Sequence, residues 1–146
     1  MPKKQNKPLH IIKVVIDTNV AVSSLLSDKG HPAHIINLVK SDSFIPYYNI
    51  SIMEEYMRVL KYPKFNFKQQ QIDGMLNLIK KRGVCTERIS TSENKMIDET
   101  DRMFYDLHKA VGAILITGNA KHYPKEPSIM SPADFMEYCS LEADDD

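Results

Sequence analysis

Acidic residues in three separate parts of the chain carry side chains of the kind that bind hard divalent cations. Asp17 follows the apolar run Ile11–Ile16, Glu55 lies in a second region, and Asp98 and Asp101 lie in a third. Two carboxylates about 4 Å apart repel each other by about 4 kcal/mol at an effective dielectric of 20, so three in one pocket would need protons or a bridging cation. Oxygen ligands without His or Cys favour Mg²⁺ or Mn²⁺ over zinc. Such a site would carry out metal-assisted hydrolysis of a phosphodiester.

Each of these acids also has a purely structural explanation. Asp17 could cap the helix that is predicted to follow it, and its position after a strand suits either role. Helical geometry places Glu55 at the border of an apolar stripe, where a Lys or Arg partner would satisfy it, and turns Glu54 towards solvent. Asp98 and Asp101, taken alone, suit the capped first turn of a helix. The chemical interpretation therefore depends on whether the fold brings the carboxylates together.

The elements that would position these residues alternate between strand and helix. Strands are predicted at 11–16, 44–48, 84–89, 113–117 and 128–130, and helices at 20–26, 31–40, 51–62, 68–82, 100–111 and 131–139. This alternation predicts an α/β fold, a parallel sheet with helices on both faces. Pro46 would place its strand at a sheet edge. Ligands of such folds bind beyond the carboxyl ends of the strands, which directs attention to residues 17–19, 47–49 and 117–119.

Length and composition limit the classes of protein that the chain can represent. Its 146 residues suit one domain, and 19 basic residues balance 19 acidic ones, which argues against a binder driven by bulk positive charge. We expect a loose N-terminal arm at 1–10, a domain at 11–140 and an acidic tail at 141–146. The apolar stretch near the start is too short for a signal peptide or a membrane span. We therefore expect a cytoplasmic protein with no membrane association, whose two cysteines are reduced and mostly buried.

Four sequence blocks resemble, in order, the motifs of PIN-domain nucleases. Residues 14–20 read Val-Val-Ile-Asp-Thr-Asn-Val, and residues 55–65 contain Glu-Tyr, Val-Leu and Pro-Lys-Phe at the spacing of the second motif. Residues 98–105 carry the pattern of two aspartates followed by Arg, Phe and Tyr. Residues 115–119 read Leu-Ile-Thr-Gly-Asn. Together the blocks cover about 11–138, and they are most similar to the toxins of bacterial and archaeal toxin–antitoxin modules.

The resemblance implies a fold, an activity and a set of site residues. The fold would be a three-layer α/β/α sandwich with a mostly parallel sheet of about five strands, and the activity would be Mg²⁺- or Mn²⁺-dependent cleavage of RNA. Asp17, Glu55 and Asp101 match the catalytic, metal-binding acids of the family. The supporting residues would be Asp98, Asn119, Thr18, Asn19 and Thr117, and the candidates for contacts with RNA are Lys121, His122 and Tyr123, whose ring could stack a base. The implied partners are an RNA substrate, an antitoxin protein and a second copy of the chain in a homodimer.

One departure from the family pattern keeps other functions open. Asn119 stands where many members have a further aspartate, so a second metal ion would be held less strongly. The alternative is a degenerate, non-catalytic PIN module that acts through a protein partner or through RNA binding. A phosphoaspartyl enzyme with Asp17 as the nucleophile is a further alternative, but such enzymes need a second aspartate two residues later, where this chain has Asn19.

Overall fold

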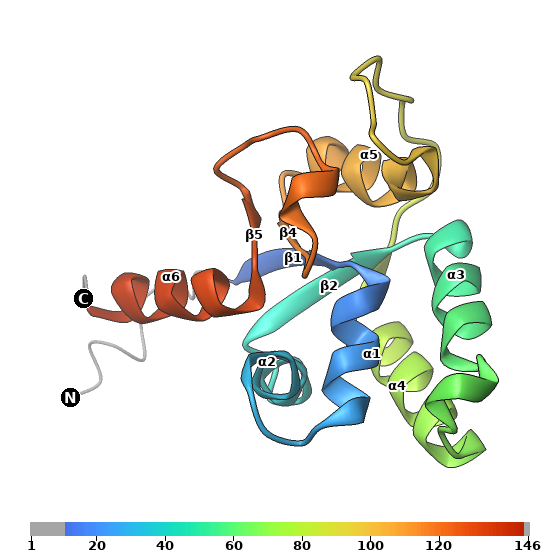
Figure 1. Ribbon diagram of the computed structural model, residues 1–146. Helices are drawn as coiled ribbons and strands as arrows, with labels where there is room; N and C mark the ends of the chain where they lie inside the picture. The colour runs from blue at the N-terminus through green and yellow to red at the C-terminus, as the bar shows by residue number, and fades with distance from the viewer. Residues whose placement is uncertain (1–10, 145–146) are drawn as a thin grey trace.

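The computed structural model describes residues 11–144, with side chains described as far as residue 141. Five strands form one parallel sheet in the order β3–β2–β1–β4–β5 (Figure 1). Their bounds are β1 Ile12–Ile16, β2 Phe44–Tyr48, β3 Val84–Cys85, β4 Ile114–Ile116 and β5 Ile129–Met130. The predicted α/β fold with a parallel sheet of about five strands is confirmed.

Helices cover both faces of this sheet. They are α1 Thr18–Leu26, α2 His31–Lys40, α3 Ile50–Leu60, α4 Gln69–Arg82, α5 Arg102–Val111 and α6 Pro132–Asp144. Helix α5 packs against β1, β2 and β4, while α1, α2 and α4 lie on the opposite side of the sheet, as Figure 1 shows. Helix α6 packs against α2 and β5. The result is the three-layer arrangement that the sequence pattern predicted.

Strand β1 is the centre of the sheet and explains the apolar run that precedes Asp17. It pairs with β2 on one side and with β4 on the other, and Val14, Val15 and Ile16 are completely buried. The chain adds β2 and β3 on one side of β1 and then crosses to β4 on the other side. The carboxyl ends of β1 and β4 therefore form the switch point at which ligands bind in such sheets. The Asp17 N–H donates to the Ile116 carbonyl at 2.9 Å, which joins the two strand ends.

The prediction that residues 44–48 form an edge strand is wrong. Strand β2 lies between β1 and β3. Pro46 is tolerated there because β3 is only two residues long and pairs with β2 from Tyr47 onwards, so no ladder bond to β3 is required at Pro46. A β-carbon at Gly83 would lie 2.4 Å from the Pro46 carbonyl oxygen, which explains why glycine ends α4 at this close approach.

Several element boundaries differ from those predicted. Helix α3 begins at Ile50, because Asn49 and not Ser51 caps it, with its side-chain oxygen accepting from the Ile52 N–H at 2.9 Å. Residues 99–101 form a 3₁₀ turn before α5. Helix α6 continues to Asp144, which is consistent with the strong helix formers Leu, Glu and Ala at 141–143. The predicted arm at 1–10 and the last two residues of the predicted tail lie outside the described residues.

The cysteines contradict one further expectation. Cys85 is exposed at the edge strand β3 and Cys139 is partly exposed on α6, so the expectation that both would be mostly buried is wrong. Within residues 11–144, no helix is long and apolar enough to cross a membrane.

Candidate active site

Asp17 is a buried carboxylate held by two side chains from the other strand end. Asp17 exposes 5 % of its surface to solvent. The Thr117 hydroxyl donates to Asp17 Oδ2 at 2.8 Å, and the Tyr123 hydroxyl donates to the same oxygen at 2.9 Å. Although Asp17 occupies the N-cap position of α1, its side chain makes no capping hydrogen bond. The backbone N–H groups of Thr18 and Asn19 also favour the charged carboxylate, so it faces the first turn of α1 as well as the β4 side of the sheet, from which Thr117 and Tyr123 orient it.

Burial and hydrogen bonding act on the Asp17 charge in opposite directions. Desolvation raises the pKa of the carboxyl group, because the charged form loses water. Hydrogen bonds from Thr117 and Tyr123 lower the pKa but do not cancel the effect of burial. Thr18, which follows Asp17 at the start of α1, is also buried, and its hydroxyl has no hydrogen-bond partner among the described residues.

Tyr123 has a different position from the one expected of a residue that stacks an RNA base. It is 5 % exposed, and its hydroxyl is engaged with Asp17. The ring is buried because the loop after β4 turns it back over the strand end, so no face is available for a base. The sequence carries no local signal for this contact, since Asp17 and Tyr123 are 106 residues apart.

The turn after β4 is fixed by hydrogen bonds from both strand ends. The Gly118 N–H donates to the Asn19 side-chain oxygen at 2.8 Å, and the Asn119 N–H donates to the Thr117 hydroxyl at 3.0 Å. The Asn119 side chain itself is exposed and makes no hydrogen bond within the described structure. Asn19 thus fixes the turn, and the Asn119 amide group remains available to a ligand.

Asp101 is the second carboxyl group of the site whose pKa is raised. Its side chain is 18 % exposed, at the start of α5. Partial burial and repulsion by the Asp17 and Asp98 carboxylates raise its pKa to about 6, and His122, whose Nδ1 lies 3.6 Å from Asp101 Oδ2, opposes that shift. Asp17 and Asp101 therefore interact through space, which supports their assignment to one centre.

Asp98 lies at the rim of this centre and has the capping role that its local sequence favours. Its carboxylate accepts from the Thr100 N–H at 3.0 Å and from the Thr100 hydroxyl at 2.7 Å. These bonds lower its pKa, and the residue is exposed. Asp98 still contributes negative charge, as its effect on the pKa of Asp101 demonstrates.

Glu55 is not joined to the other two acids. Its carboxylate lies 2.5 Å from the Arg58 guanidinium on the same helix, and the side chain is 20 % exposed. The predicted orientation of α3 is confirmed, because Glu54 is exposed and Glu55 lies at the border of the core. Among the described residues, no group of three or more acids, histidines and cysteines is arranged to hold a metal ion. Glu55 would have to leave Arg58 to join such a group.

The residues expected to contact RNA divide between surface and interior. Lys121 and His122 are exposed on the loop after β4, next to the carboxylates, whereas Tyr123 is buried beneath them. A hollow of about 530 Å³ adjoins this loop and includes Lys121 and Lys125 in its wall. The loop thus presents positive charge beside an acidic centre.

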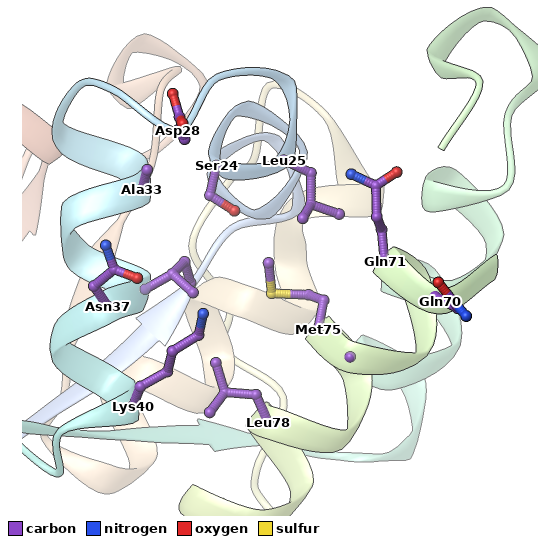
Figure 2. Close-up of a pocket in the computed structure, with 12 residues that line it drawn as sticks. Ser24, Leu25, Asp28, Ala33, Asn37, Lys40, Gln70, Gln71, Met75 and Leu78 are labelled. Atoms are coloured by element: carbon purple, nitrogen blue, oxygen red, sulfur yellow. The ribbon is translucent and has the colours of Figure 1, made fainter. Parts of the chain in front are cut away.

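A separate hollow of about 360 Å³ lies between α1, α2 and α4, away from the carboxylates. Figure 2 shows side chains from all three helices pointing into it, among them Leu25, Lys40 and Met75. None of the predicted site residues lines this hollow, so it belongs to a different part of the molecule.

The donor set at the strand ends fits a hard divalent cation. Every candidate side chain offers oxygen, and the two central carboxylates have raised pKa values. Bringing a divalent cation between such groups would relieve both the desolvation cost and the mutual repulsion. Asp17 and Asp101 would hold it, and Asn119 in the turn after β4 and Asp98 in the turn before α5 offer further oxygen atoms.

The fold and this acidic centre define a class, the parallel α/β proteins with carboxylates at the sheet switch point. Comparison with known sequences identifies the family: residues 13–121 match the PIN domain, and the chain belongs to the PIN domain family. It is also 30 % identical over 110 residues to "Uncharacterized protein MJ1680" of Methanocaldococcus jannaschii, covering 74 % of this chain and 71 % of that protein. PIN domains are generally nucleases and typically use divalent metal ions.

Proposed function

We propose that this protein is a Mg²⁺- or Mn²⁺-dependent endoribonuclease that hydrolyses RNA phosphodiester bonds. The observation that carries the proposal is that the loop after β4 contacts both acids at the switch point of a PIN-domain sheet, since Tyr123 donates to Asp17 at 2.9 Å and His122 Nδ1 lies 3.6 Å from Asp101. Two carboxylates that raise each other's cost of ionisation suit the binding of a divalent ion. RNA as the substrate is supported by the resemblance of the sequence blocks and by the exposed Lys121 and Lys125 on the loop after β4.

In this mechanism each residue has a defined task. A bound Mg²⁺ or Mn²⁺ would polarise the scissile phosphate as a Lewis acid. Asp17 and Asp101 would hold the ion, and Thr117 and Tyr123 would keep the Asp17 carboxylate in one orientation through their bonds to Oδ2. Lys121 would attract the phosphate backbone to the rim of the site.

The test is cleavage of a labelled single-stranded RNA with Mn²⁺, with Mg²⁺ and with EDTA, using a matched pair of variants on α3. Wild-type protein and Glu54→Gln should cleave equally, because Glu54 is exposed to solvent. Glu55→Gln should cleave about tenfold more slowly, because the acid that the second family motif assigns to the metal would lose its charge; a tenfold change corresponds to about 1.4 kcal/mol. No cleavage by wild-type protein with either ion would contradict the proposal. Equal losses in both variants would remove Glu55 from the site.

Asn119 determines how many ions the site holds. Its neutral amide leaves one negative charge fewer than the usual family acid would, and a carboxylate about 4 Å from a divalent ion contributes about 8 kcal/mol at an effective dielectric of 20. We expect calorimetry to detect one Mn²⁺ per wild-type chain, and Asn119→Asp to raise the affinity and to increase cleavage at limiting metal. Identical titrations of the two proteins would show that Asn119 has no part in metal binding.

The wider biological assignment is also a proposal: the protein acts in the cytoplasm as the toxin of a toxin–antitoxin pair, as a homodimer. It is supported by the similarity of the sequence blocks to such toxins. A neighbouring reading frame whose small product binds this chain and stops the cleavage would support the assignment.

A non-catalytic PIN module is the second candidate. The observations that favour it are the ion pair that holds Glu55 on Arg58 and the amide at position 119. The cleavage assay separates the two functions, since only a catalytic protein would respond to Mn²⁺ and EDTA.

A further inference from the structure

Three aromatic rings form a stack on the turn between α3 and α4. The Tyr62 and Phe65 rings have centroids 6.2 Å apart and planes 12° apart, and the Phe65 and Phe67 rings have centroids 5.5 Å apart and planes 17° apart. Pro63–Phe65 form a 3₁₀ turn that sets this spacing. All three rings are partly exposed. We call these three rings, together with Lys61, Lys64 and Lys68, the ladder surface.

The ladder surface is positively charged in a chain whose formal net charge is zero. No acid occurs from residue 56 to residue 72, a segment that contains Arg58 and three lysines. Lys61, Lys64 and Lys68 are exposed, and none of them pairs with an acid within the described part of the chain. Lys64 Nζ lies 5.2 Å from the centre of the Phe65 ring. The cations are thus interleaved with the rings.

Core packing accounts for only part of this arrangement. Phe65 and Phe67 pack against the hydrophobic core, whereas Tyr62 is not among the residues that do so. Packing explains neither the partly exposed Tyr62 ring nor three unpaired lysines around it. Stacked rings with neighbouring cations are the elements by which proteins bind single-stranded nucleic acid, with bases stacking on rings and cations facing phosphates.

A single side chain connects the ladder surface to Glu55, the acid of the second family motif. The Arg58 guanidinium donates to Glu55 Oε1 at 2.5 Å and also to the Tyr62 hydroxyl. Arg58 therefore bridges the Tyr62 ring, the first ring of the stack, and the carboxylate of Glu55.

We propose that the ladder surface binds single-stranded RNA, an inference that rests on the proposed ribonuclease function. Unpaired bases would extend the ring stack, and Lys61, Lys64 and Lys68 would face the phosphates. A protein partner suits this surface less well, because lysines are depleted at the cores of protein interfaces. RNA is favoured by the charge as well as by the rings.

The lysines are tested by RNA binding in EDTA, where cleavage does not occur. Fluorescence anisotropy with a labelled 12-nucleotide oligo-U should show Lys61→Gln/Lys64→Gln binding about tenfold more weakly than wild type. Each phosphate contact to a single strand contributes about 0.7 to the slope of log K against log salt, so losing two should reduce the slope by about 1.4. The control, Lys80→Gln/Lys81→Gln, removes two exposed lysines at the far end of α4 and should stay within twofold of wild type in affinity.

The role of the rings is tested by comparing the oligo-U affinities of Tyr62→Leu and Tyr62→Phe. We expect Tyr62→Leu to weaken binding of the oligo-U about fivefold and Tyr62→Phe to bind as wild type, because only the former removes the ring. A 12-base-pair RNA duplex should bind both variants equally, since its bases are not free to stack. Melting temperatures check that each variant is folded.

Equal oligo-U affinities of the lysine pair and its control, or of the two Tyr62 variants, would overturn the proposal and leave the surface to a protein partner. Failure of the ribonuclease function gives a different result, namely no Mn²⁺-dependent cleavage by wild-type protein while the binding differences in EDTA persist.

Discussion

Asp17→Asn is expected to reduce Mn²⁺-dependent RNA cleavage by more than 100-fold and to raise the melting temperature of the metal-free protein. A carboxylate about 4 Å from a divalent ion contributes about 8 kcal/mol at an effective dielectric of 20, and a third of that energy corresponds to 100-fold. The stability gain follows from burial, because the charged carboxylate of Asp17 is desolvated and its pKa is raised. The asparagine oxygen could still accept the bonds from Thr117 and Tyr123.

The sign of the stability effect depends on pH. A group whose pKa is raised by folding stabilises the protein fully below its unfolded pKa, and that contribution is lost as the pH rises through the folded pKa. At pH 7 the wild-type protein therefore bears the cost of the Asp17 charge, and Asp17→Asn does not. Thermal unfolding in EDTA should show a rise of a few degrees for the variant, whereas added Mn²⁺ should stabilise only the wild type. A variant that melts lower in EDTA, or that cleaves as wild type, would contradict this account.

The sequence predicted those parts of the site that burial imposes on a strand. A strand covered by helices on both faces must be apolar, so β1 and β4 could be recognised in the sequence as runs of apolar residues. The residues just after them, Asp17 and Thr117, lie at the same edge of the sheet, as predicted. The orientation of α3 was predictable for a similar reason, since one face of the helix is buried and periodicity identifies it.

Contacts between distant segments were beyond reach of the same reasoning. The bond from Tyr123 to Asp17 depends on how the loop after β4 folds back, and nothing near Tyr123 in the sequence indicates it. Arg58 illustrates a local ambiguity, since on a helix it is close to both Glu54 and Glu55. Packing at the core border decides in favour of Glu55. The interior position of β2 was missed because Pro46 was taken to require a sheet edge. Pro46 is compatible with an interior strand only because β3 is two residues long, and its length could not be predicted from the sequence.

Metal binding is expected to weaken by about tenfold for each pH unit below about 6. The pKa of Asp101 is raised to about 6 by partial burial and by repulsion from Asp17 and Asp98, so below that pH its carboxylate carries a proton that a cation must displace. Displacing one proton gives a slope of one log unit of affinity for each pH unit. Calorimetric titration of the wild-type protein with Mn²⁺ between pH 4.5 and 7.5 measures this slope and the pH at which it begins.

Asp98→Asn provides the control, because Asp98 contributes to the raised pKa of Asp101 without being buried with it. Removing that charge should lower the pKa of Asp101, and the onset of weakening should move to lower pH. In the metal-free protein, the free energy of unfolding should fall as the pH rises from about 4 to about 6, since Asp101 keeps its proton longer in the folded state than in the unfolded one. That fall should be smaller in Asp98→Asn and smaller still in Asp101→Asn, where only the part due to the raised pKa of Asp17 remains. A pH profile of Mn²⁺ affinity that Asp98→Asn does not shift would show that the repulsion between these carboxylates does not govern the site.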